Sequence, residues 1–190
     1  MKYKAYKYRI YPTKRQEVLI AKHLGCCRFL YNYALDKKVK AYQKDRTNIS
    51  WYEIKKELPK MKKSEEYCWL SEVNSASLQM SLANLDSAFV KFFREKKGFP
   101  KFKSKKDNRQ SFSIPQNTRV KFDESRVYIP KFREGIKARF HRKFEGLVKT
   151  SVITRTPTNK YYISILVEVN EEDAKAKPIS ESKAVGIDLG

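Results

Sequence analysis

The hydrophobic period of the chain changes near residue 110, and this change limits the possible folds more than any other feature. Before it, apolar side chains recur every three or four positions, the spacing of a helix with one buried stripe. The clearest series is Leu78, Leu82, Leu85, Phe89 and Phe92. After it, and again in residues 2–11, apolar and polar side chains alternate as in strands with one buried face. The pattern predicts an α+β fold whose helices interrupt a sheet.

Six strands are expected after the change of period. They are "SFSIP", "TRVKFD", "RVYIP", "IKARFH", "LVKTSVITR" and "KYYISILVEV". Six short strands in about sixty residues are typical of a small antiparallel barrel. The basic and aromatic first strand resembles them, so we expect residues 1–12 and 111–170 to form one β-barrel, with the helices of residues 13–110 as an insertion.

Helix boundaries follow from capping signals. Thr13 with Gln16, and Ser50 with Glu53, have the spacing of a capping box. Gly25 is expected to divide residues 13–45 into two helices. Pro59 is expected to stop the second capped helix. The long helix after Asn74 should carry Lys96 and Lys97 in its last turn and end before Gly98.

The net charge of the chain indicates which class of partner it binds. The chain has 42 Lys and Arg against 21 Asp and Glu, a net charge of +21, which indicates a polyanion, most simply nucleic acid. Apolar runs are too short to cross a membrane, and the start lacks a signal peptide, so we expect a cytoplasmic protein. Three cysteines, two of them adjacent, favour reduced and mostly buried thiols.

One segment concentrates basic and aromatic residues. "KFFREKKGFPKFKSKKDNR" could be an ordinary solvated surface, but the chain's charge and the interleaved phenylalanines favour phosphate binding. The candidate contacts are Lys96, Lys97, Lys101, Lys103, Lys105, Lys106 and Arg109.

Two smaller sets of residues have weaker signals. Trp51, Ser75, Gln79 and Ser113 could read base edges, although such side chains are usually only exposed. His23 and His141 have no other ligand at metal-binding spacing, so a structural role is expected.

Asp188 in "AVGIDLG" is the one catalytic candidate. It could hold Mg²⁺ on the first strand of a ribonuclease-H-like sheet, open the nucleotide-binding lobe of an actin-like ATPase, or simply end a strand. Residues 171–183, rich in acids with Pro178, read as a linker before it.

The chain resembles the N-terminal part of the TnpB/OrfB family of transposon-encoded RNA-guided nucleases. The resemblance rests on "YRIYPTKRQEVLIAKHLGCCRFLYNYAL", "WLSEVNSASLQMSLANLDSAFVKFF", "GFPKFKSKK", "YIPKFREGIKARFHR" and "VGIDLG". It implies an oligonucleotide-binding-like wedge barrel split by a helical recognition domain at residues 13–110, with a helix-turn-helix at 13–45. It also implies that residues 184–190 are the first strand of an incomplete RuvC domain.

The resemblance also implies roles and partners. Trp51, Ser75, Gln79 and Ser113 would contact a duplex motif beside the DNA target, the barrel and helices would hold guide RNA, and Asp188 would be the first RuvC acid. A RuvC site needs further acids and usually has a zinc ribbon nearby, and this sequence holds neither.

We therefore expect no nuclease activity and no bound cofactor from these residues alone, with Mg²⁺ only in a complete RuvC domain. A separately encoded RuvC half is a further candidate partner beside guide RNA and double-stranded DNA. The alternatives are a non-enzymatic helix-turn-helix-like regulator, a transposon relic and, more remotely, an actin-like ATPase.

Overall fold

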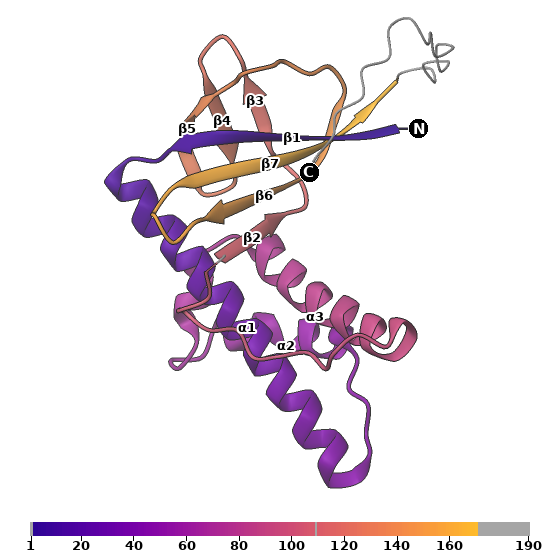
Figure 1. Ribbon diagram of the computed structural model, residues 1–190. Coiled ribbons are helices and arrows are strands. Elements are labelled where there is room, and N and C mark those ends of the chain that lie inside the picture. Colours follow the sequence, from indigo (N-terminus) through magenta and orange to yellow (C-terminus); the bar gives the residue numbers. More distant parts are fainter. Residues whose placement is uncertain (1, 109, 171–190) are drawn as a thin grey trace, which may run out of the picture.

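The computed structural model describes residues 2–108 and 110–170, which form three α-helices and one antiparallel sheet (Figure 1). The α+β class predicted from the sequence is confirmed. The helical part is α1 (Lys14–Asp45), α2 (Trp51–Met61), the short 3-10 helix η1 (Cys68–Glu72) and α3 (Ser75–Glu95). The strands are β1 (Lys2–Tyr11), β2 (Gln110–Ile114), β3 (Arg119–Lys121), β4 (Arg126–Ile129), β5 (Phe132–Arg139), β6 (Leu147–Arg155) and β7 (Tyr161–Val169).

The sheet has seven strands in the order β2-β6-β7-β1-β5-β4-β3. The first strand of the chain thus lies in the middle, between β7 and β5, and all pairings are antiparallel. The helices occupy the chain between β1 and β2, as expected for an insertion. Among the described residues the sheet is open, with β2 and β3 at its edges, so closure into an oligonucleotide-binding-like barrel is not confirmed.

The pairing register gives the sheet one apolar face. Tyr8 lies opposite Ile163, and both are buried, whereas the next pair, Arg9 opposite Tyr162, belongs to the other face. After β5 the chain turns back over the apolar face, where the ring of Phe140 meets Tyr8 edge-on with centroids 4.9 Å apart. The two-residue alternation therefore separates an apolar face from a basic and aromatic face.

Both predicted capping boxes are confirmed. The Thr13 hydroxyl accepts from the Gln16 backbone N–H, and Ser50 accepts in the same way from Glu53. The predicted break at Gly25 is wrong, because α1 is a continuous helix of 32 residues. A glycine costs a helix only about 1 kcal/mol, and the buried Leu24, Cys26 and Cys27 around Gly25 pack into the core, which offsets that cost.

Two other helix ends differ from expectation. The helix α2 continues past Pro59 to Met61, since proline removes one helical hydrogen bond while Lys62 N–H still donates to the Leu58 carbonyl at 3.1 Å. The helix α3 ends at Glu95, so Lys96 is its left-handed C-cap rather than part of the last turn. Arg94 is the basic residue in that turn.

The helices pack against each other and against the β2 edge of the sheet (Figure 1). The seam predicted for α3 is buried at Leu78, Leu82 and Leu85, which contribute to one core together with the inner face of the sheet. None of the helices described has the length and apolar character needed to cross a membrane.

Candidate nucleic-acid interface

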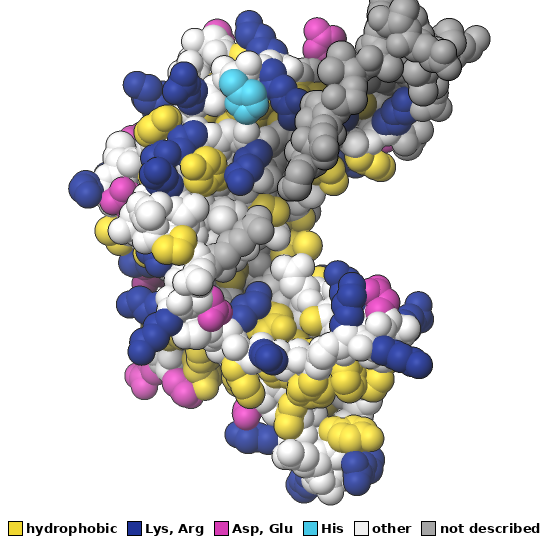
Figure 2. Space-filling view, in the orientation of Figure 1, with side chains coloured by type: hydrophobic (Ala, Val, Ile, Leu, Met, Phe, Trp, Pro, Cys, Tyr) yellow, Lys and Arg dark blue, Asp and Glu magenta, His cyan; other side chains and the backbone are white. Residues whose placement is uncertain are grey.

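The candidate interface is built where the N-terminal end of α3, the edge strand β2 and the basic segment 96–108 meet α1. Contacts join α3 and α1 to β2 directly. Figure 2 shows the surface hollowed between α3 and the sheet. We call the place where these segments meet the α3–β2 junction.

His23 lies at the centre of the α3–β2 junction. Its Nδ1 contacts the Leu19 carbonyl at 2.8 Å, and its Nε2 accepts the backbone N–H of Asn74, the N-cap of α3, at 3.1 Å. Because a carbonyl only accepts and an N–H only donates, the ring is neutral with its proton on Nδ1. The other side of the junction is Phe112 of β2, whose ring stacks on His23 at 4.8 Å.

This arrangement brings together the segments that carry two of the predicted contact residues, while strand alternation turns the Ser113 side chain to the face of β2 opposite to that of Phe112. Ser75 follows Asn74 at the start of α3, and Ser113 follows Phe112 on β2. Gln79 lies one turn further along α3, and both it and Ser113 are half-buried, while Ser75 is exposed. The structural role expected for His23 is therefore what holds these segments together.

Trp51 lies apart from this group. Lys62 at the C-terminal end of α2 donates to the Ser75 hydroxyl, whereas Trp51 is the first residue of α2, about 16 Å away along the helix axis. Its ring meets Tyr52 edge-on, and the Lys55 ammonium lies 5.6 Å from its centroid. Four residues predicted to act together thus divide into three at the junction and one at the far end of α2.

Lys103 of the basic segment contacts α1 through Asn32 and Tyr31. Asn32 donates through Nδ2 to the Lys103 carbonyl at 2.9 Å and accepts the Lys103 N–H at 2.8 Å. The Lys103 ammonium lies 4.1 Å from the centroid of Tyr31. Lys103 is exposed overall, but partial desolvation lowers its pKa, and the nearby Cys27 and Asp107 oppose this shift. Lys103 is therefore a fixed point of the segment.

The other predicted lysines with described positions are exposed to solvent, as Lys103 is. Lys97 pairs with Glu95 at 2.7 Å. The remaining exposed members are Lys96, Lys101, Lys105 and Lys106. Arg109 and Asp188, like the predicted linker and final strand, lie outside the described residues. These exposed lysines flank the fixed point in the sequence, and such a row of cations suits contact with phosphates.

Sequence reasoning missed Asn32 and Lys62, which fix the basic segment and the start of α3. Desolvation lowers the pKa of Lys62, and the cation of Lys131 lowers it further. Neither residue had a signal in the sequence, because each acts on a partner distant along the chain or on another element.

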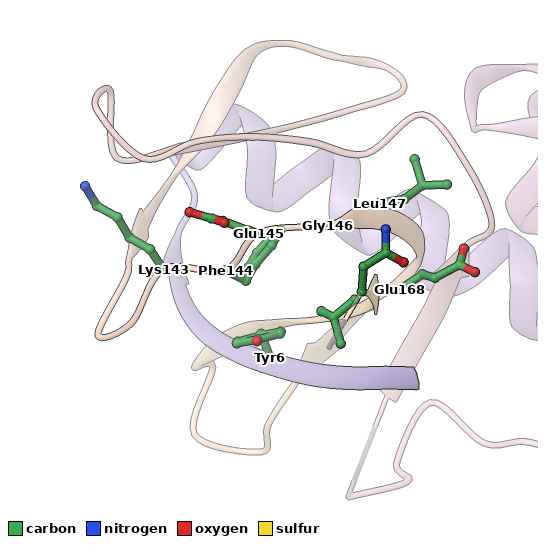
Figure 3. Close-up of a pocket in the computed structure, with 9 residues that line it drawn as sticks. Tyr6, Lys143, Phe144, Glu145, Gly146, Leu147 and Glu168 are labelled. Carbon is green, nitrogen blue, oxygen red and sulfur yellow. The ribbon is translucent and has the colours of Figure 1, made fainter. Parts of the chain in front are cut away.

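A cavity of about 730 Å³ lies at the opposite part of the sheet, between Tyr6 and the segment from Lys143 to Leu147 (Figure 3). Its lining has both signs of charge, because Glu145 and Glu168 accompany Lys143, and Glu168 is paired with Lys149 at 2.7 Å. Such a lining does not favour a polyanion.

The described residues contain no group of three or more His, Cys, Asp or Glu side chains that could hold a metal ion. The residues that the structure describes do not by themselves supply the carboxylates of a RuvC Mg²⁺ site.

Comparison with known proteins identifies a matching domain family and several related proteins. A helix-turn-helix domain family, of the OrfB and IS605 type, matches residues 1–47, which the structure shows as β1, α1 and the residues around them. A candidate RNA-guided DNA endonuclease of Streptomyces pristinaespiralis is 34% identical over 98% of this chain and 46% of its own length. The candidate RNA-guided DNA endonuclease InsQ of Escherichia coli K12 is 31% identical over 98% of this chain and 45% of its own length.

A shorter relative is matched over most of its length. The virulence protein VsdF of Salmonella dublin is 36% identical over 54% of this chain and 93% of its own length. By contrast, the chain spans about half the length of the two endonuclease relatives.

Proposed function

Because the chain belongs to the TnpB/OrfB family, whose curated relatives carry the name RNA-guided DNA endonuclease, we propose that it is the nucleic-acid-binding part of such an enzyme. Its role is to hold guide RNA and to contact a duplex motif beside the DNA target. The sheet would act as the wedge and the helices as the recognition domain.

One observation supports this proposal above the others. The α3–β2 junction brings the start of α3, which carries Ser75 and Gln79, next to β2, which carries Ser113, and the clamp between Asn32 and Lys103 fixes the basic segment to the same helix that supports the junction. Neutral hydrogen-bonding groups can read base edges, while surrounding lysines neutralise phosphates. A surface with both chemistries suits a protein that positions a duplex.

Cleavage is assigned to the remainder of the enzyme. We propose that Asp188 is the first acid of a RuvC site completed by residues beyond those of this chain, with Mg²⁺ bound only in that complete site. The purified 190-residue chain with Mg²⁺ and guide RNA should leave a target duplex intact. Guided cleavage by this chain would overturn the assignment.

The binding proposal is tested by fluorescence anisotropy with a structured RNA and with a duplex library, each at several salt concentrations. Affinity should fall steeply as salt rises, because each phosphate contact releases condensed counterions. Phosphate contacts weaken strongly between about 50 and 200 mM salt. An affinity that does not change over this range would contradict the proposal.

The double variant Gln79→Ala/Ser113→Ala tests whether these two side chains read base edges. It should lose preference among duplex sequences, by about 1–3 kcal/mol at the affected base pairs, and keep its affinity for RNA. The matched control is Gln43→Ala/Ser87→Ala, which removes the same two kinds of side chain from exposed positions on α1 and α3. Equal loss of preference in both variants would remove Gln79 and Ser113 from the interface.

A second candidate function is that of a non-enzymatic regulator that occupies guide RNA or transposon DNA. It is favoured by one comparison, since the relative VsdF is almost wholly covered by part of this chain. The two candidate functions predict different results when a RuvC half is supplied as a separate protein. Restored guided cleavage on mixing the two halves supports the enzyme, and inhibition of a complete relative supports the regulator.

A further inference from the structure

A second groove lies on the sheet away from the α3–β2 junction. It has a volume of about 590 Å³ and is formed by the end of β5, the residues that follow it and the end of β1. Its lining is Tyr11, Phe122, Ser125, Lys137, Ala138, Arg139, Phe140, His141, Arg142 and Lys143. Four of these side chains carry a positive charge and none is a carboxylate, which distinguishes this groove from the mixed-charge cavity beside Tyr6.

The strand register places basic residues directly opposite each other beside this groove. Arg9 on β1 lies opposite Arg139 on β5. On the same strand, Lys137 lies opposite Arg126 of β4, which in turn lies opposite Lys121 of β3. Like charges in directly opposed positions destabilise a sheet. A partner that supplies negative charge along this row would remove that cost.

Neutral groups position the guanidinium groups of Arg9 and Arg142. The Arg9 guanidinium lies 5.3 Å from the ring of Tyr11 and 5.6 Å from that of Tyr162, and its buried Nε has no hydrogen-bond partner. Arg142 lies 4.7 Å from the Tyr6 ring and donates to the Ala5 carbonyl at 3.4 Å. Such contacts fix a cation without neutralising it.

Acidic partners are few in this region. Of the described residues, Lys121 pairs with Glu124, which also accepts from Tyr128. No ion pair within residues 2–108 and 110–170 involves Arg9, Lys137 or Arg139. Arg9 and Arg142 are thus held by neutral contacts, while the positive charges of Lys137 and Arg139 remain available to a ligand.

We propose that this groove binds the phosphodiester backbone of a single nucleic-acid strand, with Lys137 and Arg139 each contacting a phosphate. Side chains two residues apart on one face of a strand are about 6.8 Å apart, which suits successive phosphates of an extended strand. Tyr11, 44% exposed at the rim, offers its ring to an unpaired base. This inference rests on the proposed function and adds a second binding surface to it.

The two surfaces are separate. β5 and β2 are four steps apart in the strand order, so the groove lies roughly 19 Å across the sheet from the α3–β2 junction. One chain can therefore hold a single strand in the groove while the junction contacts a duplex.

The test compares two double variants of the full 190-residue chain. Lys137→Ala/Arg139→Ala removes two charges from the groove, and Lys63→Ala/Lys160→Ala removes two exposed charges elsewhere. Fluorescence anisotropy measures binding of an unstructured RNA oligonucleotide, a DNA oligonucleotide of the same sequence, and a DNA duplex. Equal thermal midpoints establish that both variants are folded.

The groove variant should bind the single strands roughly 20-fold more weakly at 0.1 M salt than wild type, and its salt slope should fall by about 1.4, as two lost phosphate contacts require. Its duplex binding should match that of the control variant. Preference for the RNA or the DNA oligonucleotide identifies which strand the groove takes.

The outcomes separate the two proposals. If wild type binds nucleic acid and the groove variant binds single strands as well as the control does, the groove proposal is wrong while the proposed function stands. If wild type binds none of the three probes, both are wrong.

Tyr11→Leu gives an independent measurement. It should weaken binding of single strands roughly tenfold, by loss of stacking, with the salt slope unchanged. A fall in salt slope for this uncharged substitution would contradict the stacking role.

Discussion

The side-chain amide of Gln16 donates a hydrogen bond of 2.8 Å to the carbonyl oxygen of Gly135. The Oε1 atom of the same side chain accepts the N–H of Thr13 at 3.0 Å, completing the capping box of α1. Gly135 lies on β5 with φ +65°, a conformation that glycine adopts readily. One buried side chain thus fixes the start of the helical part to the sheet that carries the groove.

Replacing Gln16 with alanine should destabilise the protein by about 2 kcal/mol, since two hydrogen bonds are lost, while the Gly135 carbonyl still accepts from Arg126 at 3.2 Å. Urea unfolding of wild type and variant gives this difference directly. Gln43→Ala, at an exposed position of the same helix, should change stability by less than about 0.5 kcal/mol. Equal effects of the two substitutions would show that the link to Gly135 contributes nothing.

Gly146 has no room for a side chain. A Cβ atom there would lie 2.2 Å from the Glu168 carbonyl oxygen, and φ is +132°. Gly146→Ala should therefore cost at least about 2 kcal/mol, from backbone strain and displacement of β7. Gly98→Ala is the control, because a Cβ at Gly98 would meet nothing within 4 Å. Thermal denaturation of both variants measures the difference, and a wild-type midpoint for Gly146→Ala contradicts the geometry.

His23 should make stability depend on pH. Burial lowers the pKa of His23, the Lys131 cation adds to this, and the hydrogen bond to the Leu19 carbonyl opposes it. His23 therefore holds its proton less tightly in the folded state than in the unfolded state, where its pKa is 6.5. The contribution of neutral His23 to the free energy of unfolding is complete above the unfolded pKa of about 6.5. It is lost as the pH falls below that value toward the lower pKa of the folded state.

Unfolding free energies measured between pH 8 and pH 5, roughly spanning the titration of histidine, check this expectation. His23→Gln should be less stable than wild type at neutral pH and should lose the part of the pH dependence that His23 contributes. His141→Gln, at an exposed position, should retain that part. A pH profile identical in His23→Gln and wild type would exclude the role of His23.

The parts of the fold governed by local signals were predictable. The capping boxes at Thr13 and Ser50 and the six later strands needed only neighbours in sequence. The interruptions expected at Gly25 and Pro59 were wrong because tertiary contacts outweigh a helix propensity of about 1 kcal/mol at glycine, and because a proline near a helix end removes few hydrogen bonds.

The candidate site was predictable in composition but not in arrangement. The basic segment, Ser75 and Ser113 were recognisable by residue type or by resemblance. The junction between the segments that carry the two serines depends on His23, 51 residues before Asn74, and on its stacking against Phe112. The groove depends on the register that places Arg9 opposite Arg139, and a single sequence does not define that register.

The three cysteines should differ in reactivity. Burial raises the pKa of the Cys26 thiol to about 11 and that of Cys27 to about 12, whereas Cys68 is exposed. Since the thiolate is the reactive form, a thiol reagent at neutral pH should label Cys68 in the native protein and all three after unfolding. Cys68→Ser should leave the native protein unlabelled. Rapid native labelling of that variant would contradict the burial of the adjacent pair.

The clamp between Asn32 and Lys103 should control how ordered the basic segment is. Asn32→Ala removes both hydrogen bonds that attach the segment to α1, of 2.9 and 2.8 Å, and trypsin should then cut between Lys96 and Lys106 several-fold faster, since cleavage follows the population of the open segment. RNA affinity should fall roughly fivefold, as ordering the segment on binding costs free energy of about 1 kcal/mol. Asn48→Ala, whose side chain contacts Lys38 at 3.4 Å, is the control and should leave both rates and affinities unchanged. Faster proteolysis with unaltered RNA affinity would show that the fixed position of Lys103 has no part in binding.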